Sequence, residues 1–425
     1  MPSQGNKDGA RGDWIMAVAK ALSTREEVVK ERVGLTSNYA AAYAVKTVDV
    51  DVIAAYPITP QTTIIEKLAE FVANGEIDAE YIPVESEHSA LSAVVGAAAT
   101  GARVFTATSA QGLEFMHEVL YIASGLRLPI VMAAPGRALS APISIHGDYQ
   151  DIMSARDSGW VIMIASSAQE VYDSIIMAYR IAEDNRVLLP VMVSYDGFLM
   201  SHTTEPVELY HEEYVRKFTP RNLNRPRLDP RKPMTIGVIA SPDWYYEIKY
   251  QAINALKESK NVIKETHNEF NKAFGTNYDI VEKYMLDDAD YVLITYGGAS
   301  SGNAKEAARR ARERGLRAGV LRLRLFRPFP TDEVVSAIKY SKVVAVVDRA
   351  LSPGNTYEGP VFNDVVSALY NKGINKPVIS VVHGISQRTM LSDDFYNLYK
   401  KLDEYAKTGE YPRKTIFIGL RGGEA

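Results

Sequence analysis

Short apolar runs alternate with longer segments of helical spacing from about Asn38 onward, and this pattern constrains the fold more than any other feature. The runs are rich in β-branched residues and flanked by Gly, Pro, Ser or Asp, as strands buried on both faces are. The expected strands are Val50–Ala55, Arg103–Ala107, Pro129–Ala134, Trp160–Ala165 and Leu188–Ser194, and the expected helices are Thr62–Asn74, Glu87–Thr100, Gly112–Gly125 and Ala168–Asp184. Strands that alternate with helices predict an α/β fold with a doubly wound, mostly parallel sheet.

A break in composition divides the chain. The segment Thr219–Pro233 is rich in proline and charge, which suits an extended linker. Polar helical sequence follows, and a second α/β unit begins near Ala289 with expected strands at Tyr291–Tyr296, Gly319–Leu325, Val343–Asp348 and Pro377–Val382. We therefore expect an N-terminal extension at 1–37, a first domain at 38–218, a linker with connecting helices at 219–288, and a second domain at 289–425.

The composition excludes several classes of function. The chain has no cysteine, so it forms no disulfide, uses no thiol catalysis and holds no cysteine-ligated iron–sulfur cluster by itself. A net charge of −4 gives no reason to expect nucleic acid, and the basic stretch Arg309–Arg317 is interleaved with Ala and Glu as in a solvated helix face. No apolar segment is long enough for secretion or a membrane span, so we expect a cytoplasmic protein.

The first candidate motif is Tyr56–Thr62, YPITPQT, directly after an expected strand. Thr59 precedes a proline and is therefore pushed towards an extended backbone, whereas Pro60 suits a turn or a first helical turn. The segment can be a plain strand-to-helix loop. In doubly wound sheets, however, loops at the carboxyl ends of strands also bind ligands, so both interpretations remain open.

The second candidate motif is VESEHSA, which places Glu85 and Glu87 at the start of a helix. A carboxylate there commonly serves only to stabilise the helix N-terminus. Glycine and alanine crowd the helix that follows, and such small residues allow another backbone or a flat ligand to approach closely.

Two further motifs follow expected strands. FTATSAQGLE carries Ser109 and Gln111 in a turn that leads into a helix, where an N-cap is the simplest role. PGRALSAP carries Arg137, whose guanidinium at the edge of a sheet is suited to hold a carboxylate by paired hydrogen bonds. A surface arginine in a loop is the alternative.

Two more patterns carry less information. His146–Asp151 has no recognisable metal-ligand geometry, so we treat it as structural or pocket-lining and predict no metal site. Tyr296–Gly302 is a loose relative of a dinucleotide-binding turn but lacks the GxGxxG spacing.

Taken in order, YPITPQT, the SE pair, FTATS…QGL, RALSAP and the later RPFP segment resemble the α subunits of pyruvate:ferredoxin oxidoreductases and related 2-oxoacid:ferredoxin oxidoreductases. The resemblance covers the chain from about Asn38. It implies a pyrimidine-binding thiamine-diphosphate domain followed by a transketolase-C-terminal-like domain. By resemblance, the substrate is held by Thr59 and Arg137, and the cofactor pocket includes Pro57, Ile58, Ser109 and Gln111.

The resemblance also assigns a glutamate of this region to the N1′ atom of the thiamine aminopyrimidine. We favour Glu87 over Glu85, because Glu87 directly precedes the helix and aligns with the SE pair. Protonation of N1′ favours the 4′-imino tautomer, which removes the proton from C2 of the thiazolium. Glu87 would thus be the catalytic residue.

Thiamine enzymes hold the diphosphate through Mg²⁺ with a GDG segment, and none occurs here, since Gly147-Asp148 continues as Tyr149. The resemblance therefore implies a β subunit that binds Mg²⁺ and diphosphate. It implies γ and δ subunits, or fused forms, that carry [4Fe–4S] clusters, with CoA as co-substrate and ferredoxin as electron acceptor.

The expected function is the α subunit of an enzyme that converts pyruvate and CoA to acetyl-CoA and CO₂, or runs the reverse reaction. The same chemistry on a branched-chain, aryl or 2-oxoglutarate substrate is an alternative, because a few pocket side chains decide such a choice. Two different classes also stay open: a thiamine enzyme that transfers carbon without redox chemistry, and a non-catalytic scaffold subunit.

Overall fold

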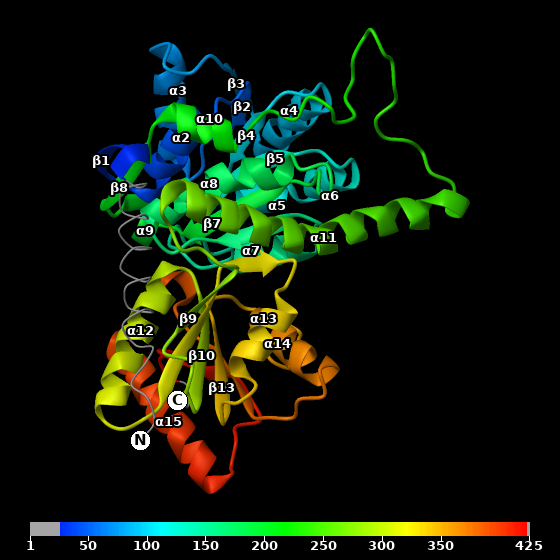
Figure 1. Ribbon diagram of the computed structural model, residues 1–425. Helices are drawn as coiled ribbons and strands as arrows, with labels where there is room; N and C mark the ends of the chain where they lie inside the picture. The colour runs from blue at the N-terminus through cyan, green and yellow to red at the C-terminus, as the bar shows by residue number, and fades with distance from the viewer. Residues whose placement is uncertain (1–25, 423–425) are drawn as a thin grey trace, which may run out of the picture.

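The computed structural model describes residues 26–422, which form two large sheets, each flanked by helices and stacked one above the other, and one small two-stranded sheet (Figure 1). The first sheet occupies the upper part of the view and the second sheet the lower part, with the long helix α11 crossing between them. Among the described residues, no helix combines the length and the apolar character needed to cross a lipid bilayer.

The first sheet has seven strands in the order β12-β6-β7-β5-β4-β2-β3. Every pairing from β6 to β3 is parallel, which confirms the expected doubly wound sheet. The strands are β2 Val52–Ala55, β3 Glu80–Pro83, β4 Val104–Ala107, β5 Ile130–Gly136, β6 Val161–Ile164, β7 Val191–Asp196 and β12 Leu325–Arg327. The edge strand β12 belongs to the RPFP region of the second half and pairs antiparallel with β6, so the two halves share this sheet.

Helices cover both faces of this sheet with separate apolar cores. One core lies under α2, α3, α8 and α11, and the other under α4, α5 and α6. The helices are α2 Ser37–Thr47, α3 Thr62–Ala73, α4 Glu87–Ala99, α5 Gln111–Phe115, α6 His117–Gly125, α7 Gln150–Ser154, α8 Ala168–Ala182, α9 Leu199–His202, α10 Glu212–Phe218 and α11 Pro242–Phe274. The expected helix Gly112–Gly125 is therefore two helices, which meet at Met116.

Part of the expected N-terminal extension is ordered against the first domain. Strand β1 (Val29–Leu35) pairs antiparallel with β8 (Glu205–Tyr210) to form a separate two-stranded sheet. Sequence analysis did not predict these two strands or β3, because they are half exposed and lack the apolar runs of the central strands. Residues 1–25 of the extension lie outside the described residues.

The second sheet has six strands in the order β15-β14-β13-β10-β11-β9, all parallel except β9. Its strands are β9 Val281–Tyr284, β10 Tyr291–Tyr296, β11 Ala318–Leu323, β13 Val343–Asp348, β14 Val378–Val382 and β15 Ile416–Phe417, and its helices are α12 Gly298–Glu313, α13 Thr331–Ile338, α14 Pro360–Asn371 and α15 Ser392–Thr408. The basic stretch on α12 is ion-paired: Arg309 contacts Glu306, Arg310 contacts Asp393, and Arg312 contacts Asp288. The basic stretch therefore forms the solvated helix face that the sequence predicts.

The carboxyl ends of strands from both sheets meet at the domain interface. Asp196, the last residue of β7, accepts hydrogen bonds from the backbone N–H groups of Gly298 (2.6 Å) and Ala299 (3.1 Å), and it pairs with the Arg349 guanidinium. A side chain at Gly297 would overlap the Tyr149 hydroxyl. The glycine turn that loosely resembles a dinucleotide site is therefore filled by the first domain.

A buried histidine gives the fold a pH dependence. His267 of α11 is 1 % exposed, and neither of its ring nitrogens has a hydrogen-bond partner. Burial, with Arg324 nearby, lowers the pKa of His267 to about 3, so between pH 3 and 6.5 the unfolded chain binds a proton that the folded chain does not. Stability is consequently lost as the pH falls below about 6.5.

We expect His267→Leu to remove this acid sensitivity. Between pH 6.5 and about pH 5 the histidine should lower the free energy of unfolding by about 2 kcal/mol, and the variant should not show this loss. Urea unfolding followed by circular dichroism at the two pH values measures the difference. The exposed His211, replaced by Gln, is the control and should leave the pH difference as it is in the parent chain.

Candidate active site

Thr59 and Arg137 lie together at the carboxyl edge of the first sheet, after β2 and β5 respectively. The Arg137 side chain is buried, and its Nη1 donates to the Thr59 carbonyl at 2.8 Å while its Nε donates to the Ser144 carbonyl at 2.9 Å. Burial lowers the pKa of Arg137, yet a guanidinium retains its charge in proteins. Its Nη2 has no partner among residues 26–422, so the guanidinium keeps a donor for a ligand.

The loop that carries Thr59 is held by two amide side chains. Buried Gln61 donates to the Ala107 carbonyl at 2.6 Å and accepts from the Ile58 N–H at 3.3 Å. Asn38 donates to the Pro60 carbonyl at 2.6 Å, on the other side of a cis Thr59–Pro60 bond. Sequence analysis did not single out Gln61 or Asn38 for this role, although Gln61 is part of the YPITPQT string.

Glu87 is the first residue of α4, after the N-cap Ser86, whose hydroxyl accepts from the Ser89 N–H. Its side chain is buried against Gly112 of α5: a Cβ at that position would lie 2.6 Å from Glu87 Oε1 and would overlap the Thr108 hydroxyl. The buried Thr108 hydroxyl has no hydrogen-bond partner, and within the described chain nothing donates to the Glu87 carboxylate. A buried hydroxyl without a partner is costly, so the pair of Thr108 and Glu87 is a candidate site for a ligand that supplies the missing hydrogen bonds.

Glu85 has a different environment. It is exposed at the surface, and the Ser89 hydroxyl that bonds to its carboxylate lowers its pKa. Of these two glutamates, Glu87 alone combines burial with a free carboxylate, which supports the preference for Glu87 over Glu85.

Asp151 connects the loop that carries Arg137 with the turn that precedes α5. Its carboxylate is completely buried and accepts from the backbone N–H groups of Ala110 (2.7 Å), Arg137 (3.0 Å) and Ile152 (2.8 Å). Burial raises the pKa of Asp151 well above its usual value, although the three donors oppose the rise. The aspartate thereby fixes the turn before α5 relative to the Arg137 loop, which agrees with a structural role for the His146–Asp151 stretch.

The remaining predicted residues surround these groups with different exposure. The Ser109 hydroxyl donates to the Pro135 carbonyl at 2.7 Å, so this hydrogen bond ties the loop after β4 to β5. Gln111 begins α5 half-buried, while Pro57 and the Thr59 side chain are exposed and Ile58 is half-buried. His146 is exposed, with its ring 5.2 Å from that of Phe198, and only its backbone joins this network, through bonds with the Ala138 N–H and the Ser144 hydroxyl.

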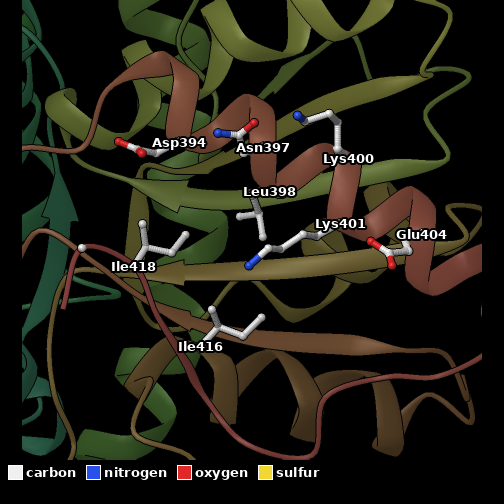
Figure 2. Close-up of a pocket in the computed structure, with 9 residues that line it drawn as sticks. Asp394, Asn397, Leu398, Lys400, Lys401, Glu404, Ile416 and Ile418 are labelled. Carbon is white, nitrogen blue, oxygen red and sulfur yellow. The ribbon is translucent and has the colours of Figure 1, made fainter. Parts of the chain in front are cut away.

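No group of three or more His, Asp, Glu or Cys side chains that could hold a metal occurs within residues 26–422. A groove at the opposite end of the chain, between α15 and β15, is lined by Lys401, Asp394, Ile416 and neighbouring residues (Figure 2). It belongs to the edge of the second sheet, whereas the candidate residues belong to the first.

The fold and the match to a family model define a thiamine-diphosphate-binding domain. Residues 43–268 match the family model described as pyruvate flavodoxin/ferredoxin oxidoreductase, thiamine diphosphate-binding, and residues 289–395 match the pyruvate:ferredoxin oxidoreductase core domain II. The chain belongs to the pyruvate:ferredoxin oxidoreductase family, within the 2-oxoacid:ferredoxin oxidoreductases.

The relatives carry two substrate names. The chain is 47% identical over 396 residues to the pyruvate synthase subunit PorA of Thermotoga maritima, covering 93% of this chain and 100% of the relative. It is 44% identical over 389 residues to the ketoisovalerate oxidoreductase subunit VorA of Pyrococcus abyssi, covering 91% and 97%. Among solved structures it resembles the 2-oxoglutarate:ferredoxin oxidoreductase of Magnetococcus marinus with a TM-score of 0.68. The two chains are 17% identical, and the match covers 88% of this chain and 65% of that chain. At this identity the likeness concerns the fold alone.

We expect Gly112→Ala to weaken thiamine-diphosphate binding by at least about 10-fold, because the added methyl group would enter the space between Glu87 and Thr108. Thiochrome fluorescence of the purified complex measures the bound cofactor. Gly302→Ala on α12 is the matched control, since a Cβ there meets nothing within 4 Å. Equal cofactor content in both variants would contradict the binding of thiamine diphosphate beside Glu87 and Gly112.

Proposed function

We propose that this chain is the α subunit of a pyruvate:ferredoxin oxidoreductase and forms the aminopyrimidine-facing half of its thiamine-diphosphate site. The observation that carries the proposal is the largely buried side chain of Glu87, which is 7 % exposed and receives no hydrogen bond within the described chain, beside the buried, unpartnered hydroxyl of Thr108, with no side chain at Gly112 to fill the space. The family match to a thiamine-binding domain supports it.

The residues present fit this cofactor. Thiamine diphosphate, when bound, supplies an electron sink that allows a 2-oxoacid to lose CO₂. Glu87 would hold a proton at the N1′ atom of the aminopyrimidine, and its low exposure of 7 % would limit the access of water to that hydrogen bond. Pro57, Ile58, Ser109 and Gln111 would line the same pocket, as the resemblance implies.

Arg137 and Thr59 would bind the substrate. The free Nη2 of Arg137 gives a charge-assisted donor for a 2-oxoacid carboxylate, while the bonds to Thr59 and Ser144 fix the plane of the guanidinium. Thr59 is exposed, and its carbonyl accepts a hydrogen bond from this guanidinium. A planar, fixed donor at this position selects for an acid and orients it.

The rest of the reaction is assigned to other chains. The sequence has no cysteine and no GDG segment, so a β subunit would bind Mg²⁺ and diphosphate, and γ and δ subunits or fusions would hold [4Fe–4S] clusters that pass electrons to ferredoxin. The relatives are themselves named as subunits, which supports an assembly. CoA as acyl acceptor, a cytoplasmic location, and a division into domains at 38–218 and 289–425 complete the proposal.

The test is 2-oxoacid-dependent reduction of viologen by the purified complex in the presence of CoA. We expect pyruvate to give the highest kcat/KM. The likeness to VorA favours ketoisovalerate as the second candidate, so that acid and 2-oxoglutarate are assayed in parallel. Activity with ketoisovalerate and none with pyruvate would overturn the substrate assignment, whereas a complex without iron and acid-labile sulfide would overturn the redox class.

A further inference from the structure

Exposed apolar side chains lie on α5, on α6 and on a projecting segment that leads into α11. We call residues 234–250 the arm; it begins directly after the proline-rich segment Thr219–Pro233 and includes the first turns of α11. In Figure 1 the loop at its start extends away from both sheets. The exposed large side chains of this surface are Phe115, Tyr121, Ile122, Met234, Val238, Ile239, Trp244, Tyr245, Tyr246, Ile248 and Tyr250.

These side chains are exposed to an unusual degree. Ile239 is fully exposed, Tyr246 is 75 % exposed and Trp244 is 67 % exposed. Large apolar patches on a protein surface mark sites that another molecule covers, because each Å² of apolar area left in water costs about 25 cal/mol. The exposed apolar side chains of the arm are therefore suited to pack against another molecule.

The arm and α6 enclose a groove of about 510 Å³. Tyr121 and Ile122 form the α6 wall, while Val238, Tyr245 and Ile248 form the wall from the arm. From Met234 to Ala240 the segment makes no hydrogen bond to the rest of the described chain. Just before it, the chain is anchored where Leu228 N–H donates to the Ala99 carbonyl at 2.8 Å.

That anchor connects the arm to the candidate site through one helix. Glu87 is the first residue of α4 and Ala99 is the last, a separation of about 18 Å along the helix axis. Phe115, at the end of α5, lies with its ring 5.9 Å from that of His88, the neighbour of Glu87. The exposed surface thus begins at the site and ends at the arm, within the width of one protein interface.

We propose that the subunit carrying the diphosphate and metal half of the thiamine site docks on this surface, with the arm held against it and an apolar segment of that subunit in the α6 groove. The inference rests on the proposed function, which requires a second chain to close the site beside Glu87. Phe115 contacts His88 beside Glu87, and the other end of α4 is bonded to the chain just before the arm, so a chain that covers Glu87 lies near both. One occupant therefore explains both the incomplete site and the exposed apolar surface.

Photo-crosslinking of the assembled complex tests the contact. The crosslinking amino acid p-benzoylphenylalanine replaces Tyr246 on the arm or, as the matched control, the similarly exposed Tyr370 on α14 of the second domain. Mass spectrometry then identifies the chain that is joined. We expect the Tyr246 position to join the GDG-bearing subunit. Joining instead to a second copy of this chain, to a cluster-bearing chain, or to nothing in an intact complex would overturn the proposal.

A double variant, Ile239→Asp with Trp244→Glu, gives an independent measurement. We expect at least a 10-fold loss of the GDG-bearing subunit from the complex purified on a tag of this chain, with the circular dichroism of the chain unchanged. The control Tyr370→Glu should retain the subunit. Full retention by the double variant would contradict the docking.

The two proposals fail in distinguishable ways. A complex that crosslinks as expected but shows no 2-oxoacid oxidation would refute the proposed function and leave the interface in place. A complex that oxidises pyruvate but whose arm crosslinks elsewhere would refute only the interface.

Discussion

Glu87→Gln is expected to lower the turnover of the assembled complex by about 10²- to 10⁴-fold, the usual contribution of a positioned acid–base group. Glutamine has nearly the same shape and fills the same space against Gly112 and Thr108, so the pocket should persist. An amide cannot carry the carboxylate's proton, however. Thermal stability should be unchanged or slightly higher, because no hydrogen bond within the described chain is lost and a charge is removed from a largely buried side chain.

The measurement is viologen reduction at saturating substrate, with bound thiamine diphosphate determined on the same sample. Glu85→Gln is the control, since Glu85 is two residues away but exposed and bonded to Ser89. We expect it to retain the parent turnover. Near-parent turnover in Glu87→Gln would exclude Glu87 as the catalytic carboxylate, and a loss confined to Glu85→Gln would transfer the role to its neighbour.

Arg137→Lys is expected to raise the KM for the 2-oxoacid by about 10- to 100-fold, with a smaller change in kcat, because the variant loses a charge-assisted hydrogen bond worth roughly 1.5–3 kcal/mol. Lysine keeps the positive charge but lacks the planar fork that bonds to Thr59 and Ser144 while leaving Nη2 free. The variant would therefore keep a positive charge but lose the fixed orientation of the hydrogen-bond donor.

Steady-state kinetics with varied 2-oxoacid at fixed CoA measure this effect. Arg127→Lys is a matched control: Arg127 is also partly buried and donates to the backbone carbonyls of Val187 and Leu188, but it precedes β5, whereas Arg137 follows it. The control should change stability without changing KM. Equal KM values for Arg137→Lys and the parent would exclude carboxylate binding by Arg137.

Sequence analysis could predict the central strands because residues buried on both faces of a parallel sheet must be apolar along their whole length, as Ile130–Ala134 are. It missed β3, whose exposed edge position removes that requirement. It predicted a single helix over Gly112–Gly125, because apolar spacing continues through Met116 although the helix is interrupted there. Periodicity records which side chains are buried and carries less information on where a helix is interrupted.

The sequence by itself determined the class of fold, the candidate groups Thr59, Glu87 and Arg137 through their motifs, and the need for other chains through the missing cysteines and GDG segment. These depend on residue type and order along the chain. Only the tertiary structure showed that Asp151 ties Ala110 to Arg137, that Asp196 fills the glycine turn of the second domain, and that Glu87 is buried without a partner while Glu85 is not. Those properties arise when segments distant in sequence meet at one sheet edge, where burial and the supply of hydrogen-bond donors are decided by neighbours that no local pattern specifies.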